Sequence, residues 1–328
     1  MKLSVSMKDW LMYSWKKNGK FGYIDNTGKM VIQPRFYYAD IFNEGLARVQ
    51  MEENGKFGYI DKAVNTVIPP MFYDADRFHE GLARVKVEEN GKYGYIDKNG
   101  NMIIPPKFYY ADIFHEGLAR VKLGENEKYG YIDKKGNLLK SMFYDADKFN
   151  EGLAWVQLNK NGKQGYIDKN GNMVIRLKFL SHAFKNWGRG FHEGLAAVDN
   201  GKWGYIDKKG NMVIKPNFIQ ADPFNEGLAA VQVEKNGKYG YVDNAGRMVI
   251  QPSFYWAFDF CEGLANVKLE ENGKHGYIDK KGNIVIKPRF YSGSEFNLYE
   301  GLAPVQLEKN GKWGYIDKTG NIVIGYPH

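Results

Sequence analysis

The chain has 328 residues, of which 43% are hydrophobic and 26% are charged, and this composition excludes an intrinsically disordered protein. The net charge of +8 is mild and spread along the chain, so it favours acidic partners only weakly. A single cysteine, Cys261, excludes an intrachain disulfide and fits a reducing compartment. No apolar run approaches the roughly 20 residues of a membrane span, and the first 15 residues lack signal-peptide features. We therefore expect a cytoplasmic protein without membrane association.

A repeat of about 36 residues dominates the sequence. The motif Gly-Tyr-Ile-Asp, with Val for Ile in one copy, begins at Gly22, Gly58, Gly94, Gly130, Gly165, Gly204, Gly240, Gly276 and Gly314. A second motif, Glu-Gly-Leu-Ala, begins at Glu44, Glu80, Glu116, Glu151, Glu193, Glu226, Glu262 and Glu300. These motifs predict a single repeat domain over residues 1–328, with nine repeats of approximate bounds 1–43, 44–79, 80–115, 116–150, 151–192, 193–225, 226–261, 262–299 and 300–328.

Each repeat contains the signals of short antiparallel strands, as the third repeat shows. Residues 81–87 alternate between apolar and charged side chains, which predicts a first strand with one face open to solvent. Residues 93–97 form a second strand, and we expect Asp97 to accept backbone N–H bonds from the turn that follows it. That turn should hold Gly100 at a positive φ angle.

A third strand is predicted at residues 102–104 and should end at the prolines Pro105 and Pro106. The chain must then return to the starting end of the sheet, and residues 107–116 suffice for this as an irregular fourth strand or a packed loop. Because the second and third strands are apolar on both faces, the small sheets should stack on one another. The expected fold is all-β, with sheets of three to four short strands stacked as a propeller-like toroid or an open superhelix.

The recurring pattern, written as KWGYIDKKGNMVIKPNF at residues 202–218 and FNEGLAAV at residues 224–231, closely resembles the bacterial WG-repeat family. Trp203 and Trp313 match the family's Trp-Gly pair, whereas other repeats carry Phe, Tyr, Gln164 or His275. The resemblance implies an all-β repeat protein of bacteria or their phages, with no general enzymatic activity and no catalytic residues to carry over. The segment 94–100 is more weakly similar to cell-wall-binding aromatic repeats, which bind choline or glucan, although the 36-residue period and the recurring proline depart from them.

No phosphate-binding loop, HExxH motif, CxxC pair or nucleophile elbow occurs in the sequence, so we expect no enzyme and no cofactor. Glu80 and its equivalents should hold backbone amides or pair with lysine where repeats meet. Three histidines share one repeat position but lie in different repeats, which argues against a metal site: His79, His115 and His192. Cys261 has no evident base and should be an inert packing residue. The tyrosines of the Gly-Tyr motif are expected to be core residues rather than a stacking ladder for sugars or bases.

The informative positions vary while the repeat pattern stays fixed. On the first strands, side chains that we expect to leave the core face form a basic strip that could bind an anion or stay solvated, with Trp155 at its edge: Arg48, Arg84, Lys86, Arg120 and Lys122. The pattern also breaks at two insertions, residues 180–190 and 292–299, and more mildly at residues 64–66 and 176–177. Loops at such junctions carry function more often than the frame does, although tolerated drift explains them equally well.

These observations favour a non-catalytic binding or scaffold protein. Its partner is expected to be a protein or an anionic small molecule or polymer, such as a nucleotide or a nucleic acid, and the oligomeric state stays open. The alternative is a carbohydrate- or cell-wall-binding repeat protein.

Overall fold

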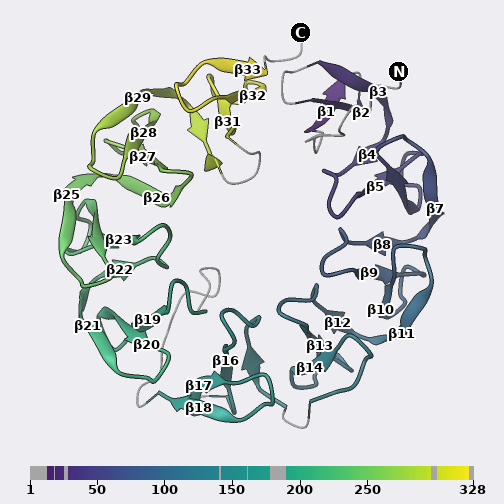
Figure 1. Ribbon diagram of the computed structural model, residues 1–328, viewed down its shortest axis with the longest axis horizontal. Coiled ribbons are helices and arrows are strands. Elements are labelled where there is room, and N and C mark those ends of the chain that lie inside the picture. Colours follow the sequence, from purple (N-terminus) through teal and green to yellow (C-terminus); the bar gives the residue numbers. More distant parts are fainter. Residues whose placement is uncertain are drawn as a thin grey trace, which may run out of the picture. The chain divides into compact units, whose positions relative to one another are not determined.

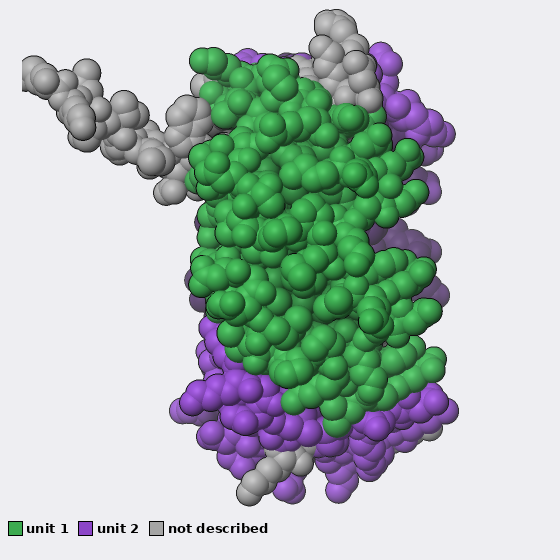
Figure 2. Space-filling view, turned by 90° about the vertical axis from the view of Figure 1, so that its right-hand side faces the viewer, with its two compact units in different colours: residues 1–113, 123–125, 323–328 green, residues 114–122, 126–322 purple. Residues whose placement is uncertain are grey.

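The computed structural model describes residues 13–17, 19–25, 29–139, 142–160, 162–177, 190–296 and 301–324, and its named elements are all β-strands (Figure 1). The chain forms two compact units (Figure 2). Unit 1 comprises residues 1–113, 123–125 and 323–328, and unit 2 comprises residues 114–122 and 126–322.

Strands of four kinds recur along the chain. Short strands, mostly of two residues, are β4 (Tyr38–Ala39), β8 (Asp74–Ala75), β12 (Tyr110–Ala111), β15 (Asp145–Ala146), β22 (Gln220–Ala221), β26 (Trp256–Cys261) and β30 (Ser292–Gly293). Ala strands, most of which follow the Glu-Gly turn, are β1 (Tyr13–Lys17), β5 (Leu46–Gln50), β9 (Ala83–Lys86), β13 (Leu118–Lys122), β16 (Ala154–Gln157), β19 (Leu195–Asp199), β23 (Leu228–Gln232), β27 (Leu264–Lys268) and β31 (Ala303–Gln306).

The other two kinds contain the Gly-Tyr motif and the segment after it. Tyr strands are β2 (Lys20–Ile24), β6 (Phe57–Asp61), β10 (Tyr93–Ile96), β14 (Gly130–Asp133), β17 (Gln164–Ile167), β20 (Trp203–Asp207), β24 (Tyr239–Asp243), β28 (His275–Asp279) and β32 (Trp313–Ile316). Long strands are β3 (Met30–Phe36), β7 (Thr66–Phe72), β11 (Met102–Phe108), β18 (Met173–Arg176), β21 (Met212–Phe218), β25 (Met248–Phe254), β29 (Ile284–Phe290) and β33 (Ile322–Ile324).

Each complete sheet runs in the order short, Ala, Tyr and long strand, and all pairs are antiparallel. In unit 1 the sheet β8-β9-β10-β11 shows the register, with Ala75 opposite Val85 and Tyr95 opposite both Arg84 and Ile104. The return segment is therefore an irregular fourth strand, which confirms one of the two expected alternatives. This short strand pairs with the Ala strand of the repeat that follows, so it belongs to that repeat's sheet. In unit 2 the long strands such as β21 and β25 form one edge of their sheets (Figure 1).

The sheets pack face to face, and the core lies between them. Within unit 1, Ala83, Val85 and Ile96 of one sheet pack against Tyr59 and other aromatic residues of the preceding sheet. Tyr59 is fully buried, and its hydroxyl donates a hydrogen bond of 2.6 Å to the Asp76 carbonyl. Its equivalents are buried too, except Tyr315 of the last repeat, which is half-buried, so these Gly-Tyr tyrosines are core residues, as expected.

The turn after the Tyr strand agrees with the sequence prediction. Asp97 accepts hydrogen bonds from the backbone N–H groups of Asn99 and Asn101, at 2.9 and 2.8 Å. Gly100 has a φ of 85°. Gly94 of the motif is required for a different reason, because a Cβ atom there would lie 2.6 Å from the Ile104 carbonyl oxygen.

The prediction for the third strand is wrong in two respects. The strand does not end at its prolines but continues to Phe108 as β11 (Met102–Phe108). It lies at the edge of the sheet, where a proline that lacks an N–H group is tolerated. Only one of its faces is covered, since Ile104 is buried while Ile103 is 43% exposed, so the expectation of two buried faces is wrong.

The Glu-Gly turn links consecutive sheets. Glu44 and Gly45 have φ angles of 50° and 89°, the values of a tight two-residue hairpin turn. The Glu44 carboxylate accepts a hydrogen bond from the Gly81 N–H at 3.0 Å and pairs with the Lys98 ammonium at 3.0 Å. Burial works to raise the pKa of Glu44, but the bonds from Lys98 and Gly81 outweigh it and lower the pKa.

This glutamate clip, the carboxylate with its glycine N–H and lysine in the next repeat, recurs in unit 2. The glutamates with both partners are Glu116 (Gly152, Lys169), Glu151 (Gly194, Lys208), Glu226 (Gly263, Lys280) and Glu262 (Gly301, Lys318). The expectation that these glutamates hold amides and lysines where repeats meet is confirmed. A glutamate in the left-handed region is strained, and the clip provides the compensating contacts.

Candidate functional site

The predicted basic strip is not an open face. The Arg48 side chain is only 14% exposed, and its guanidinium pairs with the Asp40 carboxylate at 3.1 Å. It also donates a hydrogen bond to the Ala75 carbonyl and lies 4.8 Å from the centre of the Tyr38 ring. Because β8 belongs to the next sheet, Arg48 ties two sheets of unit 1 together.

Arg84 and Arg120 are placed in the same way. Arg84 is 18% exposed, pairs with the Asp76 carboxylate at 2.8 Å and donates to the Ala111 carbonyl at 2.6 Å. Arg120 donates to the Ala146 carbonyl and lies 4.9 Å from the Tyr129 ring centre.

The remaining residues at this strand position are buried or partly buried as well. Trp155 is 1% exposed, and both Ala230 and Asn266 are fully buried. The expectation that side chains at this position leave the core is therefore wrong, because the face opposite the Ala and Val side chains is covered by the next sheet. Ligand binding by these residues stays a prediction.

The two lysines of the strip are less enclosed. The Lys86 ammonium lies 4.8 Å from the centre of the Tyr93 ring, and that of Lys122 lies 4.2 Å from the centre of the Tyr129 ring. Both side chains are half-buried over these rings. They contact the same aromatic rings as the neighbouring arginines. The strip therefore consists of arginines that bind the next sheet and lysines that lie over aromatic rings.

A different place in unit 2 departs most clearly from the repeat pattern. In the described residues between β14 and β15 there is no long strand, and only the isolated bridges Tyr129–Phe143 and Ile132–Leu138 remain. The next long strand, β18, has four residues where complete ones have seven. Leu177 stands where other repeats carry proline, and its N–H donates to the Gln164 carbonyl at 2.9 Å.

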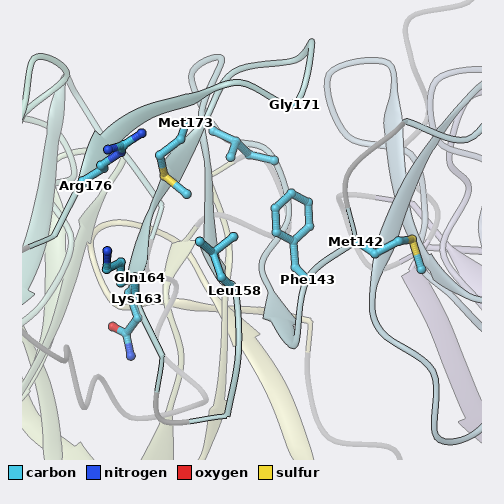
Figure 3. Close-up of a pocket in the computed structure, with 9 residues that line it drawn as sticks. Met142, Phe143, Leu158, Lys163, Gln164, Gly171, Met173 and Arg176 are labelled. Carbon is cyan, nitrogen blue, oxygen red and sulfur yellow. The ribbon is translucent and has the colours of Figure 1, made fainter.

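These departures surround a pocket of about 510 Å³ (Figure 3). Its volume is within the range of small-molecule sites. The residues that line it are Met142, Phe143, Leu158, Lys163, Gln164, Ile167, Gly171, Met173 and Arg176. Phe143 and Ile167 are buried, and Met142, Leu158 and Met173 are half-buried. Apolar side chains thus make up about half of the lining.

Two cationic side chains share this pocket. Arg176 is the register partner of Gly165, and Lys163 lies two residues before that glycine, so both leave the same face of the sheet. Both are exposed, and neither forms an ion pair with any residue that the structure describes. The arrangement can hold a molecule with an apolar body and an anionic group.

The sequence contained part of this signal. Gln164 in place of an aromatic residue and the change at residues 176–177 were visible departures, but the pocket also depends on the missing long strand before β15. In the sequence, residues 137–141 lack the Met-Val-Ile-x-Pro pattern of the complete long strands. The larger insertion at residues 180–190 lies outside the described residues except for Gly190, and the second ends outside them, at residues 297–299.

The titratable candidates serve as contacts between repeats. The His192 ring nitrogen Nε2 lies 3.1 Å from Nδ2 of Asn150, and burial lowers the pKa of His192. Asn225 donates to the Cys261 sulfur at 3.8 Å, and burial raises the pKa of that thiol to about 11. Among the described residues, no group of three or more His, Cys, Asp or Glu side chains is arranged to hold a metal ion. The described part of the chain also has no helix that is long and apolar enough to cross a bilayer.

The solved structures that match this chain share little sequence with it. Virginiamycin B lyase from Staphylococcus aureus is 11% identical, with 82% of this chain and 90% of that chain covered and a TM-score of 0.35. BamB from Moraxella catarrhalis is 10% identical, with 83% and 94% covered and a TM-score of 0.38. Dihydro-heme d1 dehydrogenase NirN is 9% identical, with 95% and 71% covered and a TM-score of 0.48. At these values the likeness carries no argument about function.

A search of curated proteins found no match. The sequence model of the WG containing repeat, in contrast, matches along most of the chain. The matched residues are 21–56, 57–93, 93–126, 129–163, 165–179, 203–239, 239–274, 276–313 and 313–325. With the repeated sheets and the Trp-Gly pairs at Trp203 and Trp313, these matches show that the chain belongs to the WG containing repeat family.

Proposed function

We propose that this protein is a non-catalytic binding protein whose pocket beside β17 and β18 holds a small molecule with an apolar body and an anionic group. The observation that supports this most strongly is the pair Lys163 and Arg176, which extend from one sheet face and share the pocket with apolar lining residues. Cations without a protein partner are costly to bring together unless solvent or an anion neutralises them. We therefore favour this pocket over the arginine strip as the site of the anionic ligand expected from the sequence.

The lining supports binding rather than catalysis. None of the residues that line the pocket carries a hydroxyl, thiol, imidazole or carboxyl group. General acid–base catalysis draws mainly on such groups. The lysine and arginine can orient an anion, and the amide of Gln164 adds a neutral group to the lining.

The experiment compares two double variants by titration with 8-anilinonaphthalene-1-sulfonate, a probe with aromatic rings and a sulfonate. Lys163→Ala/Arg176→Ala removes both cations of the pocket. Lys202→Ala/Lys215→Ala removes the same charge at the equivalent positions beside β20 and the complete strand β21. We expect the first variant to weaken binding at least about tenfold, which corresponds to about 1.4 kcal/mol, and the second to leave it nearly unchanged. Equal loss in both variants, with melting temperatures unchanged, would reject the pocket as the anion site.

A glycan is the second candidate ligand, because exposed tyrosines recur along the chain. Each directly follows a buried phenylalanine, and they are Tyr37, Tyr73, Tyr109, Tyr144, Tyr255 and Tyr291. Aromatic rings at a regular spacing are suited to stacking on sugars. Binding of chitooligosaccharides that is insensitive to salt and equal in both double variants would favour this function over the anionic ligand.

A further inference from the structure

An aspartate in unit 1 shows how a carboxylate between sheets is normally neutralised in this protein. Asp40 follows the short strand β4, and its N–H donates to the Arg48 carbonyl at 3.0 Å. Its carboxylate pairs with Arg48 of the same sheet at 3.1 Å and is approached by Arg77 of the next sheet at 3.6 Å. Two cations therefore face one half-buried carboxylate.

Asp222 in unit 2 occupies the same place. It follows the short strand β22, its N–H donates to the Ala230 carbonyl at 2.9 Å, and its carbonyl accepts from the Tyr205 hydroxyl at 2.7 Å. The position of Arg48 is thus taken by Ala230, which has no charge.

The position of Arg77 is taken by another aspartate. Arg77 directly precedes Phe78, whose ring centre lies 4.9 Å from that of Tyr59. Asp259 directly precedes Phe260, whose ring centre lies at the same distance of 4.9 Å from that of Tyr241. Asp222 therefore has neither of the two cations that surround Asp40, and Asp259 stands in place of one of them.

The groups around these two carboxyls are acidic or phenolic. Burial raises the pKa of Asp222 to about 7, and the charge of Asp259 adds to this rise. Burial and the charge of Glu295, which follows β30, raise the pKa of Asp259 to about 7 as well. The other titratable groups whose charges act within this cluster come from β20, β24 and the end of β26, namely Tyr205, Tyr239, Tyr241 and Cys261. Among the described residues, neither aspartate forms an ion pair.

We propose that the contact between the sheets β22–β25 and β26–β29 is a pH-sensitive junction, closed while Asp222 and Asp259 hold at least one proton between them and weakened when both are ionised. Two half-buried carboxylates that interact with each other cost free energy when both are ionised. The contact between these two sheets would thus weaken as the pH rises, while the Glu226 clip, which joins the same two sheets, stays formed.

The sign of the effect follows from proton binding. The folded-state pKa values lie above the ordinary value of 3.8, so between about pH 4 and pH 7 the folded chain binds more protons than the unfolded chain. The contribution of this pair to stability is therefore complete below the ordinary pKa and is lost as the pH rises through about 7. His192 and His275 have lowered pKa values and act in the opposite direction below about pH 6.5, so the comparison must be between variants.

Carbon-13 NMR of the full chain with labelled aspartate carboxyls tests the proposal directly. We expect two carboxyl signals with midpoints above pH 6 in the wild-type protein. In Asp259→Asn one of these signals should disappear, and the midpoint of the other should fall. If no aspartate of the wild-type protein titrates above pH 5.5, the proposal is wrong, and this result does not depend on whether any variant folds.

Thermal and urea unfolding provide the second measurement. Asp259→Arg gives Asp222 one of the two cations that Asp40 has, and Asp199→Asn serves as the control because it removes a carboxyl from β19, outside the pair. Between pH 5 and pH 8, the unfolding equilibrium constant of the wild-type protein and of the control should rise at least about tenfold more than that of Asp259→Arg. The same pH dependence in all three proteins would overturn the proposal.

Discussion

Arg48, Arg84 and Arg120 each donate a hydrogen bond to a backbone carbonyl of a following short strand, and Arg48 and Arg84 also pair with half-buried aspartates. The alternation of residues 81–87 correctly separated these side chains from Ala83 and Val85. The alternation did not reveal that the opposite face is covered. A pattern within one strand shows which side chains share a face, but it does not show which sheet packs on that face.

We predict that the triple change Arg48→Ala, Arg84→Ala and Arg120→Ala destabilises the protein. Removing each arginine leaves a carbonyl unbonded, and for two of them it also leaves an aspartate without its ion pair, at about 1–3 kcal/mol for each site. Urea unfolding measures the loss, and the control is Lys86→Ala/Lys122→Ala, which removes two cations that form no ion pair among the described residues and should change stability less. A triple variant with an unchanged unfolding midpoint would show that the contacts of these arginines do not stabilise the protein.

At the scale of the elements, the glutamate clip offers a natural comparison within unit 2. Glu226 accepts from Gly263 and pairs with Lys280, whereas Glu193 accepts from Gly227 at 2.8 Å and has no ion pair among the described residues. Asn244 stands at the position where the other clips have a lysine.

We predict that Glu226→Gln lowers the free energy of unfolding by about 0.5–1 kcal/mol and that Glu193→Gln lowers it less. Burial opposes the lowered pKa of Glu226, but the bonds from Lys280 and Gly263 prevail. The contribution of Glu226 is therefore present above its ordinary pKa and lost as the pH falls through its lowered folded-state pKa. Urea unfolding should show a smaller difference between the variants at pH 3.5 than at pH 7. A difference of the same size at both pH values would mean that the clip is not electrostatic.

Some of the elements could be predicted from the sequence, and others could not. The Ala and Tyr strands, the turn at Asp97 and the contacts of the glutamates follow from local patterns and in-chain repetition. The long strand could not be delimited, because proline ends a central strand but not an edge strand, and the edge is a property of the whole sheet. The pocket was missed for a related reason, since it requires a strand to be absent from one repeat beside a shortened strand in the next.

For the whole molecule, the all-β repeat architecture could be predicted from the repeated strand and turn patterns, because nine copies of one pattern specify nine similar sheets. The family could be predicted from the resemblance of the repeat motif itself. Function could not be predicted in this way, since a regular repeat describes the frame that the copies share. The specific chemistry is found where copies differ, as at Lys163 and Arg176 or at Asp222 and Asp259.

The claim that the pocket binds an anionic ligand is tested most directly by NMR of methionine methyl groups during titration with 8-anilinonaphthalene-1-sulfonate. Met142 and Met173 line the pocket, whereas Met212 and Met248 occupy the position of Met173 at the start of complete long strands. Substitution of each methionine by leucine assigns its signal. We predict that the signals of Met142 and Met173 shift with one common dissociation constant, that those of Met212 and Met248 stay in place, and that Lys163→Ala/Arg176→Ala abolishes the shifts. Equal shifts at all four methionines, or none at Met142 and Met173, would contradict the account.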